Sequence, residues 1–294
     1  MWLRSRPARR SVGTLLSALP LLLVLGGCTS TYQYHWSYFF DSIFRPDAQI
    51  VGGLWLTVSI AVVSQLIGVV LGVLAALAKL SRIVPFRVAA NLYIWLFRGT
   101  PLVVQIVFFF FGLSVAKIYT WPDLDLFGLV TIPGEIQAGI FALGVNEGAY
   151  MAEIVRAGIL SIDPGQMEAA KSLGMTYGLA MRRIILPQAA RVIVPPLGNE
   201  FNNMLKTTSL LVLISVPELY TIFNRKQGQY FAPFEFFLAA AVWFLLLTTL
   251  WGFVQGWIER RLGRGASPTA AGPSWRERLF GRAEVEPSLV SGGR

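Results

Sequence analysis

The chain has 294 residues, of which 54% are hydrophobic and only 14% charged, a composition too apolar for a typical soluble domain. Its net charge of +9 does not indicate nucleic-acid binding, because the basic residues fall between long apolar runs instead of forming one patch. The single cysteine, Cys28, and the single histidine, His35, exclude an internal disulfide and leave too few soft ligands for zinc. We therefore expect an all-α membrane protein without a nucleic-acid partner and without a metal site.

Residues 1–30 form a leader of ambiguous type. Four arginines precede an apolar core from Leu15 to Leu25, and Gly26-Gly27-Cys28 follows. Small residues before a cysteine are typical of a bacterial lipoprotein signal, in which Cys28 would carry the lipid. The alternative is an extra transmembrane helix that stays attached, with Cys28 near its outer end. We favour the retained helix or an unacylated leader, because one cysteine after glycine is a weak pattern.

Residues 31–258 contain five apolar stretches long enough to cross a bilayer. A helix needs about 20 apolar residues to span the hydrocarbon core, and residues 48–78 contain no charge at all. The other four spans are expected at about 99–116, 136–159, 192–216 and 236–258. The sequence thus predicts a five-helix core, and the polar residues within its third and fourth spans indicate where function should be sought.

The distribution of Lys and Arg predicts the orientation of this core. Twenty of these residues lie in the amino terminus, in 79–98, around 156–191 and in the tail, against four in the alternating segments. Because cytoplasmic segments carry the excess of basic residues, the core should begin outside and the carboxyl terminus should be cytoplasmic. The tail, 259–294, is rich in Arg, Gly, Pro and Ser and is expected to be disordered.

A polar loop near residues 157–187 has the pattern of two short helices. Asp163 can cap the first helix, Pro164 suits its first position, and Gly174 can take the left-handed conformation that ends it. Thr176 can cap a second helix, which Pro187 should end at Leu186. The residues at fixed spacing in this loop are Glu168, Ala169, Ala170, Gly174, Ile184, Leu186 and Pro187.

This spacing resembles the EAA loop of the transmembrane subunits of ATP-binding cassette (ABC) importers. Segments 53–58, 97–105, 148–156 and 205–210 also resemble the permeases for polar amino acids such as histidine, glutamine, glutamate, arginine, lysine and opines. The likeness covers residues 50–258 and implies the type I importer fold in a bacterial inner membrane. It also implies that the first short helix is a coupling helix that docks on a cytoplasmic ATPase.

The resemblance implies several partners. They are the ATPase, which binds ATP and magnesium, a second permease subunit of the same or a related chain, and an extracytoplasmic solute-binding protein. The chain itself carries no phosphate-binding G-x-x-x-x-G-K-[ST] loop. We therefore expect no cofactor on this chain and no catalysis by it.

Polar residues inside the spans are candidates for a solute pathway, because an ionised group there needs a partner or water. On a helix, Asn199, Asn202, Asn203 and Lys206 should share one face. Alternatively, the Asn and Lys side chains pack a dimer interface, and Glu153 pairs with Arg156. Pro195, Pro196 and Gly198 make the fourth span easy to break. The candidate pathway residues are Glu153, Asn199, Glu200, Asn202, Asn203 and Lys206.

Two other classes of protein remain as alternatives. A secondary transporter driven by an ion gradient is the first, although five spans without an evident inverted repeat weigh against it. A membrane enzyme is the second, and a single His and a single Cys leave little material for a catalytic set. The hypothesis we favour is the permease subunit of an ABC importer for a polar amino acid or a derivative.

Overall fold

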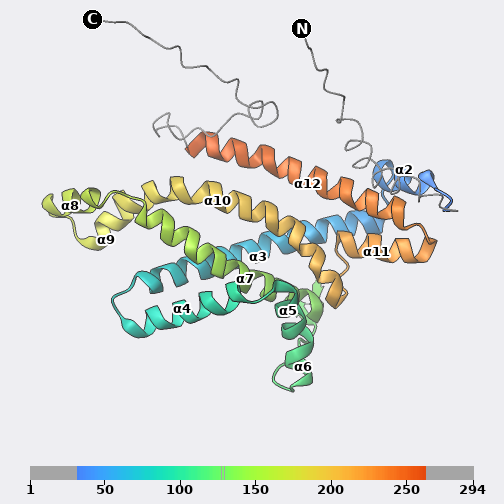
Figure 1. Ribbon diagram of the computed structural model, residues 1–294, viewed down its shortest axis with the longest axis horizontal. Helices are drawn as coiled ribbons and strands as arrows, with labels where there is room; N and C mark the ends of the chain where they lie inside the picture. The colour runs from blue at the N-terminus through green and yellow to red at the C-terminus, as the bar shows by residue number, and fades with distance from the viewer. Residues whose placement is uncertain (1–31, 127, 129, 263–294) are drawn as a thin grey trace, which may run out of the picture.

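The computed structural model describes residues 32–126, 128 and 130–262. The leader 1–30, with the proposed lipidation site Cys28, and the tail beyond residue 262 lie outside the described residues. Four long helices run along the long axis in Figure 1, namely α3 (Ala48–Leu80), α7 (Gly134–Leu160), α10 (Leu186–Thr207) and α12 (Pro233–Leu262). They cover four of the five spans expected from the sequence.

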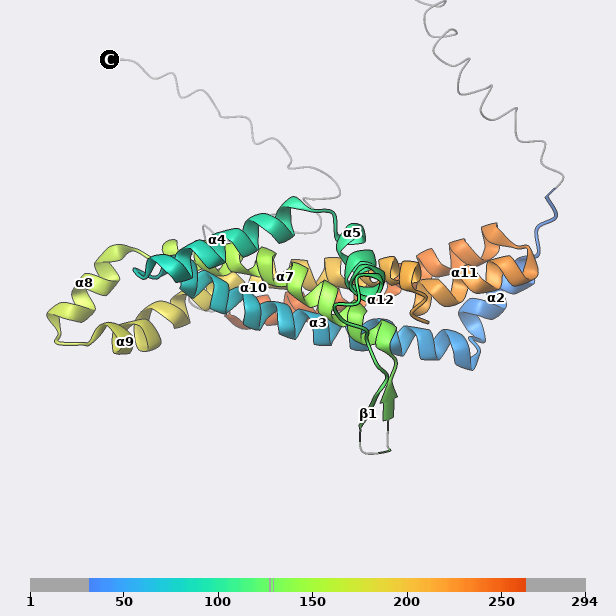
Figure 2. The same ribbon diagram turned by 90° about the horizontal axis from the view of Figure 1, so that it is seen from below.

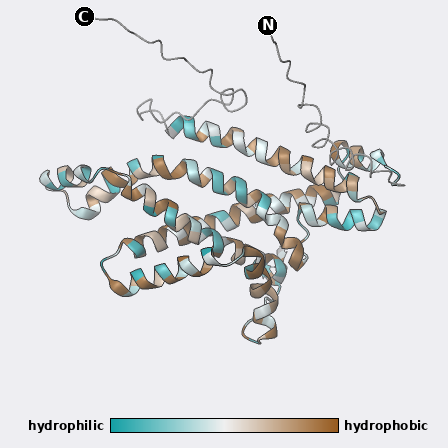
Figure 3. Ribbon diagram, in the orientation of Figure 1, coloured by the Kyte–Doolittle hydropathy of each residue, from teal (hydrophilic) through white to brown (hydrophobic). Residues whose placement is uncertain are grey.

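α3 and α12 are mostly apolar, whereas α7 and α10 carry polar residues along their length as well (Figure 3). Within the described residues, α3 and the Pro233–Arg261 part of α12 are long and apolar enough to cross a membrane. Two bent pairs of helices raise the number to as many as four by the same measure. α7 is not among them, and it carries Asn146, Glu147 and Glu153 in its interior.

The remaining expected span, 99–116, is irregular. α4 (Val84–Gly99) is followed by α5 (Leu102–Val107), the π-helical segment η1 (Phe108–Gly112) and α6 (Leu113–Val115), and the chain turns by 104° between α4 and the latter group. Thr100 is extended at the bend, as expected for a residue before Pro101. α5 and α6 consequently project from the bundle in Figure 1.

α4 was not expected as a helix, because the basic residues of 79–98 suggested a simple connection. Its buried Ala90 and Ile94 lie four residues apart and so face the same side. The hydroxyl of Tyr93 donates to the carbonyl of Val145 in α7 at 2.6 Å. α4 therefore packs along the bundle as an amphipathic helix.

A short hairpin interrupts the helical pattern. β1 (Leu124–Leu126) pairs antiparallel with β2 (Val130–Ile132), and Gly128 adopts a positive φ of 71° in the turn. Figure 2 shows the hairpin extending away from the bundle. Apart from this hairpin, the regular elements among the described residues are helical, as expected for an all-α membrane protein.

α3 and α7 pack closely because both present glycines at a spacing of four. These are Gly68 and Gly72 on α3 and Gly144 and Gly148 on α7, an arrangement that lets helix backbones approach one another. A Cβ added at Gly72 would lie 2.2 Å from the Cβ of Met151, and one added at Gly68 would lie 2.5 Å from Cγ of Glu147. Any side chain at these positions would force the two helices apart.

The polar loop forms the two helices that the sequence predicts at its start. α8 (Pro164–Ser172) is capped by Asp163, whose Oδ1 accepts from the N–H of Gly165 at 2.8 Å. Gly174 has a φ of 78° just after α8. α9 (Tyr177–Ala180) follows Thr176, whose side chain makes no capping hydrogen bond. α8 and α9 lie at one end of the molecule in Figure 1.

The prediction that Pro187 ends the second helix is wrong. α9 continues through the π-helical segment η2 (Met181–Ile185) into α10, and Pro187 sits in the first turn of α10. The π-helical turn directly before Pro187 is where the hydrogen-bond register shifts, which accommodates a residue without an N–H. Pro195 and Pro196 both lie inside α10, which continues through them.

The opposite end of the bundle contains a second bend. α10 leads into the 3-10 segment η3 (Thr208–Ile214), Ser215 takes a φ of 63°, and α11 (Leu219–Tyr230) follows at 50°. The buried carboxylate of Glu218 caps α11, accepting from the N–H of Thr221 at 2.6 Å, and also accepts from the hydroxyl of Thr57 in α3 at 3.3 Å. α2 (Trp36–Phe44) rests on α12, where Trp243 donates to the carbonyl of Ser42 at 3.1 Å.

Candidate functional site

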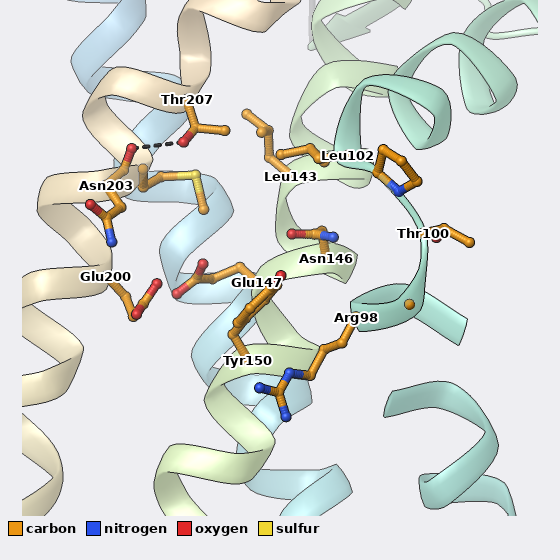
Figure 4. Close-up of a pocket in the computed structure, with 13 residues that line it drawn as sticks. Arg98, Thr100, Leu102, Leu143, Asn146, Glu147, Tyr150, Glu200, Asn203 and Thr207 are labelled. Carbon is orange, nitrogen blue, oxygen red and sulfur yellow. Dashed lines mark hydrogen bonds between the residues drawn. The ribbon is translucent and has the colours of Figure 1, made fainter. Parts of the chain in front are cut away.

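A polar cavity of about 570 Å³ lies among α7, α10 and the bend between α4 and α5. Figure 4 shows side chains from all three regions directed toward it. Its volume is within the range usual for small-molecule sites. The lining residues are Arg98, Gly99, Thr100, Pro101, Leu102, Leu143, Asn146, Glu147, Tyr150, Glu200, Asn203, Met204 and Thr207.

Gln105 fixes the wall of the cavity at the α4–α5 bend. Its Nε2 donates to the carbonyl of Phe97 at 2.9 Å and to the hydroxyl of Thr100 at 2.8 Å. Its Oε1 accepts from Nδ2 of Asn146 at 3.0 Å, and Asn146 also donates to the carbonyl of Phe97 at 3.1 Å. This network ties the exposed bend to α7 and holds Arg98 at the cavity edge.

Glu147 supplies a buried carboxylate to the cavity. The residue is only 6% exposed, and its Oε1 accepts from Nε2 of Gln65 at 3.0 Å. Gly68 on α3 leaves room for the side chain of Glu147, because a Cβ at position 68 would lie only 2.5 Å from Cγ of Glu147. Figure 4 shows the carboxylates of Glu147 and Glu200 facing one another from α7 and α10.

Arg98 lies on the other side of the cavity. Its guanidinium group sits over the ring of Tyr150 at 5.2 Å from the centroid, a cation–π contact that leaves its N–H donors free to bind oxygen. The ion pairs among the described residues join Lys79 to Glu153, Arg156 to Glu153 and Lys226 to Asp47. None of them involves Arg98, Glu147 or Glu200.

The structure divides the predicted pathway residues. Glu200 and Asn203 line the cavity. Glu153 instead pairs with Lys79 at 2.6 Å and with Arg156 at 2.9 Å, as the alternative hypothesis had it. Asn199 accepts from Nε2 of Gln255 in α12 at 3.1 Å.

Of the four residues expected to share one face of the fourth span, namely Asn199, Asn202, Asn203 and Lys206, only Asn203 lines this cavity. Lys206 lines a separate hollow with Tyr220 and residues of α12, and Oδ1 of Asn202 is buried without a hydrogen-bond partner among the described residues. The stripe that borders the cavity is Glu200, Asn203 and Thr207, at spacings of three and four along α10.

Sequence reasoning did not select four of the polar or charged side chains that line this cavity: Arg98, Asn146, Glu147 and Tyr150. The sequence did contain an indication for Asn146 and Glu147, which stand next to each other inside the apolar stretch 136–159. An ionisable residue within a span is expensive and indicates a site. The sequence placed Arg98 at the end of a basic segment between two spans. Its position beside the cavity could not be predicted, because it depends on the bend between α4 and α5.

The predicted coupling residues lie together at the far end of the bundle from α11. Glu168 and Ala169 are exposed on α8, whereas Ala170 is buried against the rest of the loop. Ile184 lies in η2, and Leu186 and Pro187 open α10. Gly174, with its positive φ, forms the turn between the two short helices.

A family model described as "Binding-protein-dependent transport system inner membrane component" matches residues 68–264, two thirds of the chain. The chain belongs to this family. The arginine transport system permease protein ArgU of Corynebacterium glutamicum is 36% identical over 271 residues, covering 90% of this chain and 83% of the relative. The nopaline transport system permease protein NocQ of Agrobacterium fabrum is 37% identical, covering 69% of this chain and 86% of the relative.

Solved structures agree with this assignment. A crystal structure of an amino acid ABC transporter with histidines is 38% identical, with a TM-score of 0.65, and the match covers 76% of this chain and 98% of that chain. The methionine ABC transporter MetNI, at 21% identity and a TM-score of 0.58, supports the fold alone. The chain is therefore a permease subunit of an ABC importer of the amino-acid branch, not a secondary transporter and not an enzyme.

Proposed function

We propose that this permease passes a polar amino acid or a derivative through the cavity bounded by α7, α10 and the α4–α5 bend. The observation that carries the proposal is a set of ionisable groups there that form no ion pair among the described residues. Arg98 offers donors for a carboxylate, and Glu147 and Glu200 offer acceptors for an ammonium group. Such groups are costly within a membrane span unless a partner or water meets them, and a zwitterion supplies both charges.

The end of the bundle formed by α8 and α9 is proposed to dock on the cytoplasmic ATPase, which binds ATP and magnesium. Support comes from the exposed Glu168 and Ala169, from the Gly174 turn and from the similarity of this loop to the EAA loop. With α8 on the cytoplasmic side, the carboxyl terminus is cytoplasmic and α11 lies near the outer surface. There an extracytoplasmic solute-binding protein would deliver the solute, and a second permease, identical or related, would complete the pathway.

Transport and ATP hydrolysis measured together test both assignments. The permease is reconstituted in liposomes with its ATPase and its solute-binding protein, and uptake of labelled amino acids is compared with stimulated hydrolysis. A hydrogen bond to a charged group contributes about 1.5–3 kcal/mol, so loss of the bond from Asn203 to the charged solute in Asn203→Leu should weaken uptake by roughly ten- to a hundredfold while hydrolysis persists. Glu168→Lys should abolish both, because it reverses a charge on the docking helix.

Asn199→Leu is the matched control, since Asn199 lies on the same helix but contacts Gln255 rather than the cavity. It should retain most of the uptake. Equal losses of uptake and hydrolysis in Asn203→Leu and Asn199→Leu would show that α10 serves assembly and that the solute passes elsewhere. Full stimulated hydrolysis in Glu168→Lys would refute the docking assignment for α8.

A further inference from the structure

A groove of about 430 Å³ lies between the first turns of α3 and the helix α11, at the end of the bundle that α2 and α11 form in Figure 1. The two helices run antiparallel beside it. Lys226 pairs with Asp47 at one end, and Thr57 donates to the carboxylate of Glu218 at the other. The residues that line this α3–α11 groove differ from those of the solute cavity.

The wall of the α3–α11 groove changes from polar to apolar along α3. Gln49 and Lys226 line the end next to Asp47. The apolar part is formed by Gly52, Leu56, Pro217 and Ile222. Because α3 is long and apolar enough to cross a membrane, this change in polarity follows the direction from the membrane surface toward its interior.

Trp55 indicates how deep the groove lies. Its side chain is 73% exposed on α3, next to Leu56 in the sequence. Exposed tryptophan is enriched where the hydrocarbon core of a bilayer meets the headgroups. The polar end of the groove therefore lies at the level of the lipid headgroups, and the end that contains Leu56 lies at the level of the acyl chains.

Arg225 gives the groove a positive charge. Its guanidinium group donates to the carbonyl of Ser215 at 3.0 Å, and it belongs to none of the ion pairs among the residues that the structure describes. The charges of Lys226 and Asp47 cancel in their ion pair. The groove therefore has a net charge of about +1, and the other N–H groups of Arg225 can donate to an anion.

We propose that the α3–α11 groove binds one anionic phospholipid, with its phosphate at Arg225 and an acyl chain along Gly52 and Leu56. A Cβ added at Gly52 would meet nothing within 4 Å, so open space for the chain is present. The two ends of the groove match the two parts of a lipid. A loop of a water-soluble partner would match the charge of Arg225 but not the apolar end beyond Trp55. This inference goes beyond the proposed function and does not depend on which solute is transported.

Native mass spectrometry of the purified full-length permease tests the proposal, because one spectrum counts both the bound lipids and the copies of the permease. The protein is titrated with phosphatidylglycerol, which is anionic, or with phosphatidylcholine of the same acyl chains, which is zwitterionic. The wild type should retain one phosphatidylglycerol in preference to phosphatidylcholine. One basic residue near the membrane surface changes the affinity for anionic lipid by roughly fivefold, so Arg225→Gln should reduce this preference by about that factor. Arg87→Gln is the control, because Arg87 is exposed on α4 and does not line the groove; it should keep the wild-type preference.

Gly52→Phe tests the apolar part of the groove. The added ring should occupy the space of the acyl chain and reduce retention of both lipids, and the fold should tolerate it because the position is open. Gly252→Phe is the matched control, since Gly252 on α12 is equally open and lies outside the groove. It should retain lipid as the wild type does.

Four results would overturn the inference. The first is equal retention of the two lipids by the wild type, and the second is an equal loss of preference in Arg225→Gln and Arg87→Gln, which would indicate general attraction to surface charge. The third is a shift from dimer to monomer in Gly52→Phe with unchanged lipid retention, which would assign the groove to a second permease. The fourth is unchanged lipid retention in Arg225→Gln together with weaker stimulation of ATP hydrolysis by the loaded solute-binding protein, which would assign the groove to that protein.

Discussion

Gly72→Ala tests the close contact between α3 and α7. The new Cβ would lie 2.2 Å from Cβ of Met151 and 3.0 Å from the backbone nitrogen of Ala152, whereas carbon atoms pack at about 3.5 Å. The helices must therefore separate locally by about 1.3 Å, the difference between these carbon distances. Because one contact is to backbone, a change of side-chain rotamer cannot relieve it.

Overpacking of this kind costs about 1–3 kcal/mol, and part of that cost is offset by the better helix propensity of alanine, roughly 0.5–1 kcal/mol. Gly52→Ala measures the offset by itself, because Gly52 lies on the same helix and a Cβ there would meet nothing within 4 Å. The difference between the two variants then isolates the packing term.

The assay is equilibrium unfolding of the purified permease in mixed detergent micelles, titrated with a denaturing detergent. Gly72→Ala should lower the free energy of unfolding by about 1–3 kcal/mol relative to Gly52→Ala. Solute uptake in liposomes should weaken as well, because Gln65 on α3 would move away from Glu147 on α7. Equal stability of the two alanine variants would refute the claim that these glycines set the helix spacing.

Gln105→Leu removes the donor that joins Phe97 and Thr100, so the free energy of unfolding should fall by about 1–3 kcal/mol; Gln229→Leu on the exposed surface is the control. Burial alone would raise the pKa of Asp47, but the hydrogen bonds from Lys226 and from the backbone hold that pKa below its ordinary value of 3.8. Asp47 therefore stabilises the fold above that pH, and the stabilisation is lost as pH falls through the lowered pKa. Asp47→Asn should flatten the acid side of the stability–pH profile, and an unchanged profile would contradict the ion pair.

Uninterrupted apolar length made the long helices predictable. Residues 48–78 contain no charge, and α3 covers them as Ala48–Leu80. The 104° bend after Gly99 was not predictable in the same way, because Thr100-Pro101 permits an extended bend without requiring one. What fixes it is Gln105, whose partners become neighbours only after the chain has turned.

Rules for helix caps and turns predicted the structure where residues adjacent in sequence determine it, and failed where contacts between distant residues determine it. Asp163 and Gly174 act within a few residues, and both behave as their side chains predict. Pro187 would break a regular α-helix. The π-helical turn directly before it shifts the hydrogen-bond register, so that the missing N–H of Pro187 is accommodated. On α10 the sequence named Glu200 and Asn203 among its candidates, but only packing against α7 and α12 shows that these two border the cavity whereas Asn199 contacts Gln255.

The continuity of α9, η2 and α10 makes one rod of the run Tyr177–Ile214. Glu200 lies on the same rod as Tyr177, about 35 Å away at the rise of an α-helix, and no loop between them absorbs a displacement. The π-helical turn also sets the rotational phase between the two ends of the rod, because each added or removed residue turns an α-helix by about 100°. Deleting one residue of η2 would leave both ends helical and point the α8 arm in a different direction relative to the cavity.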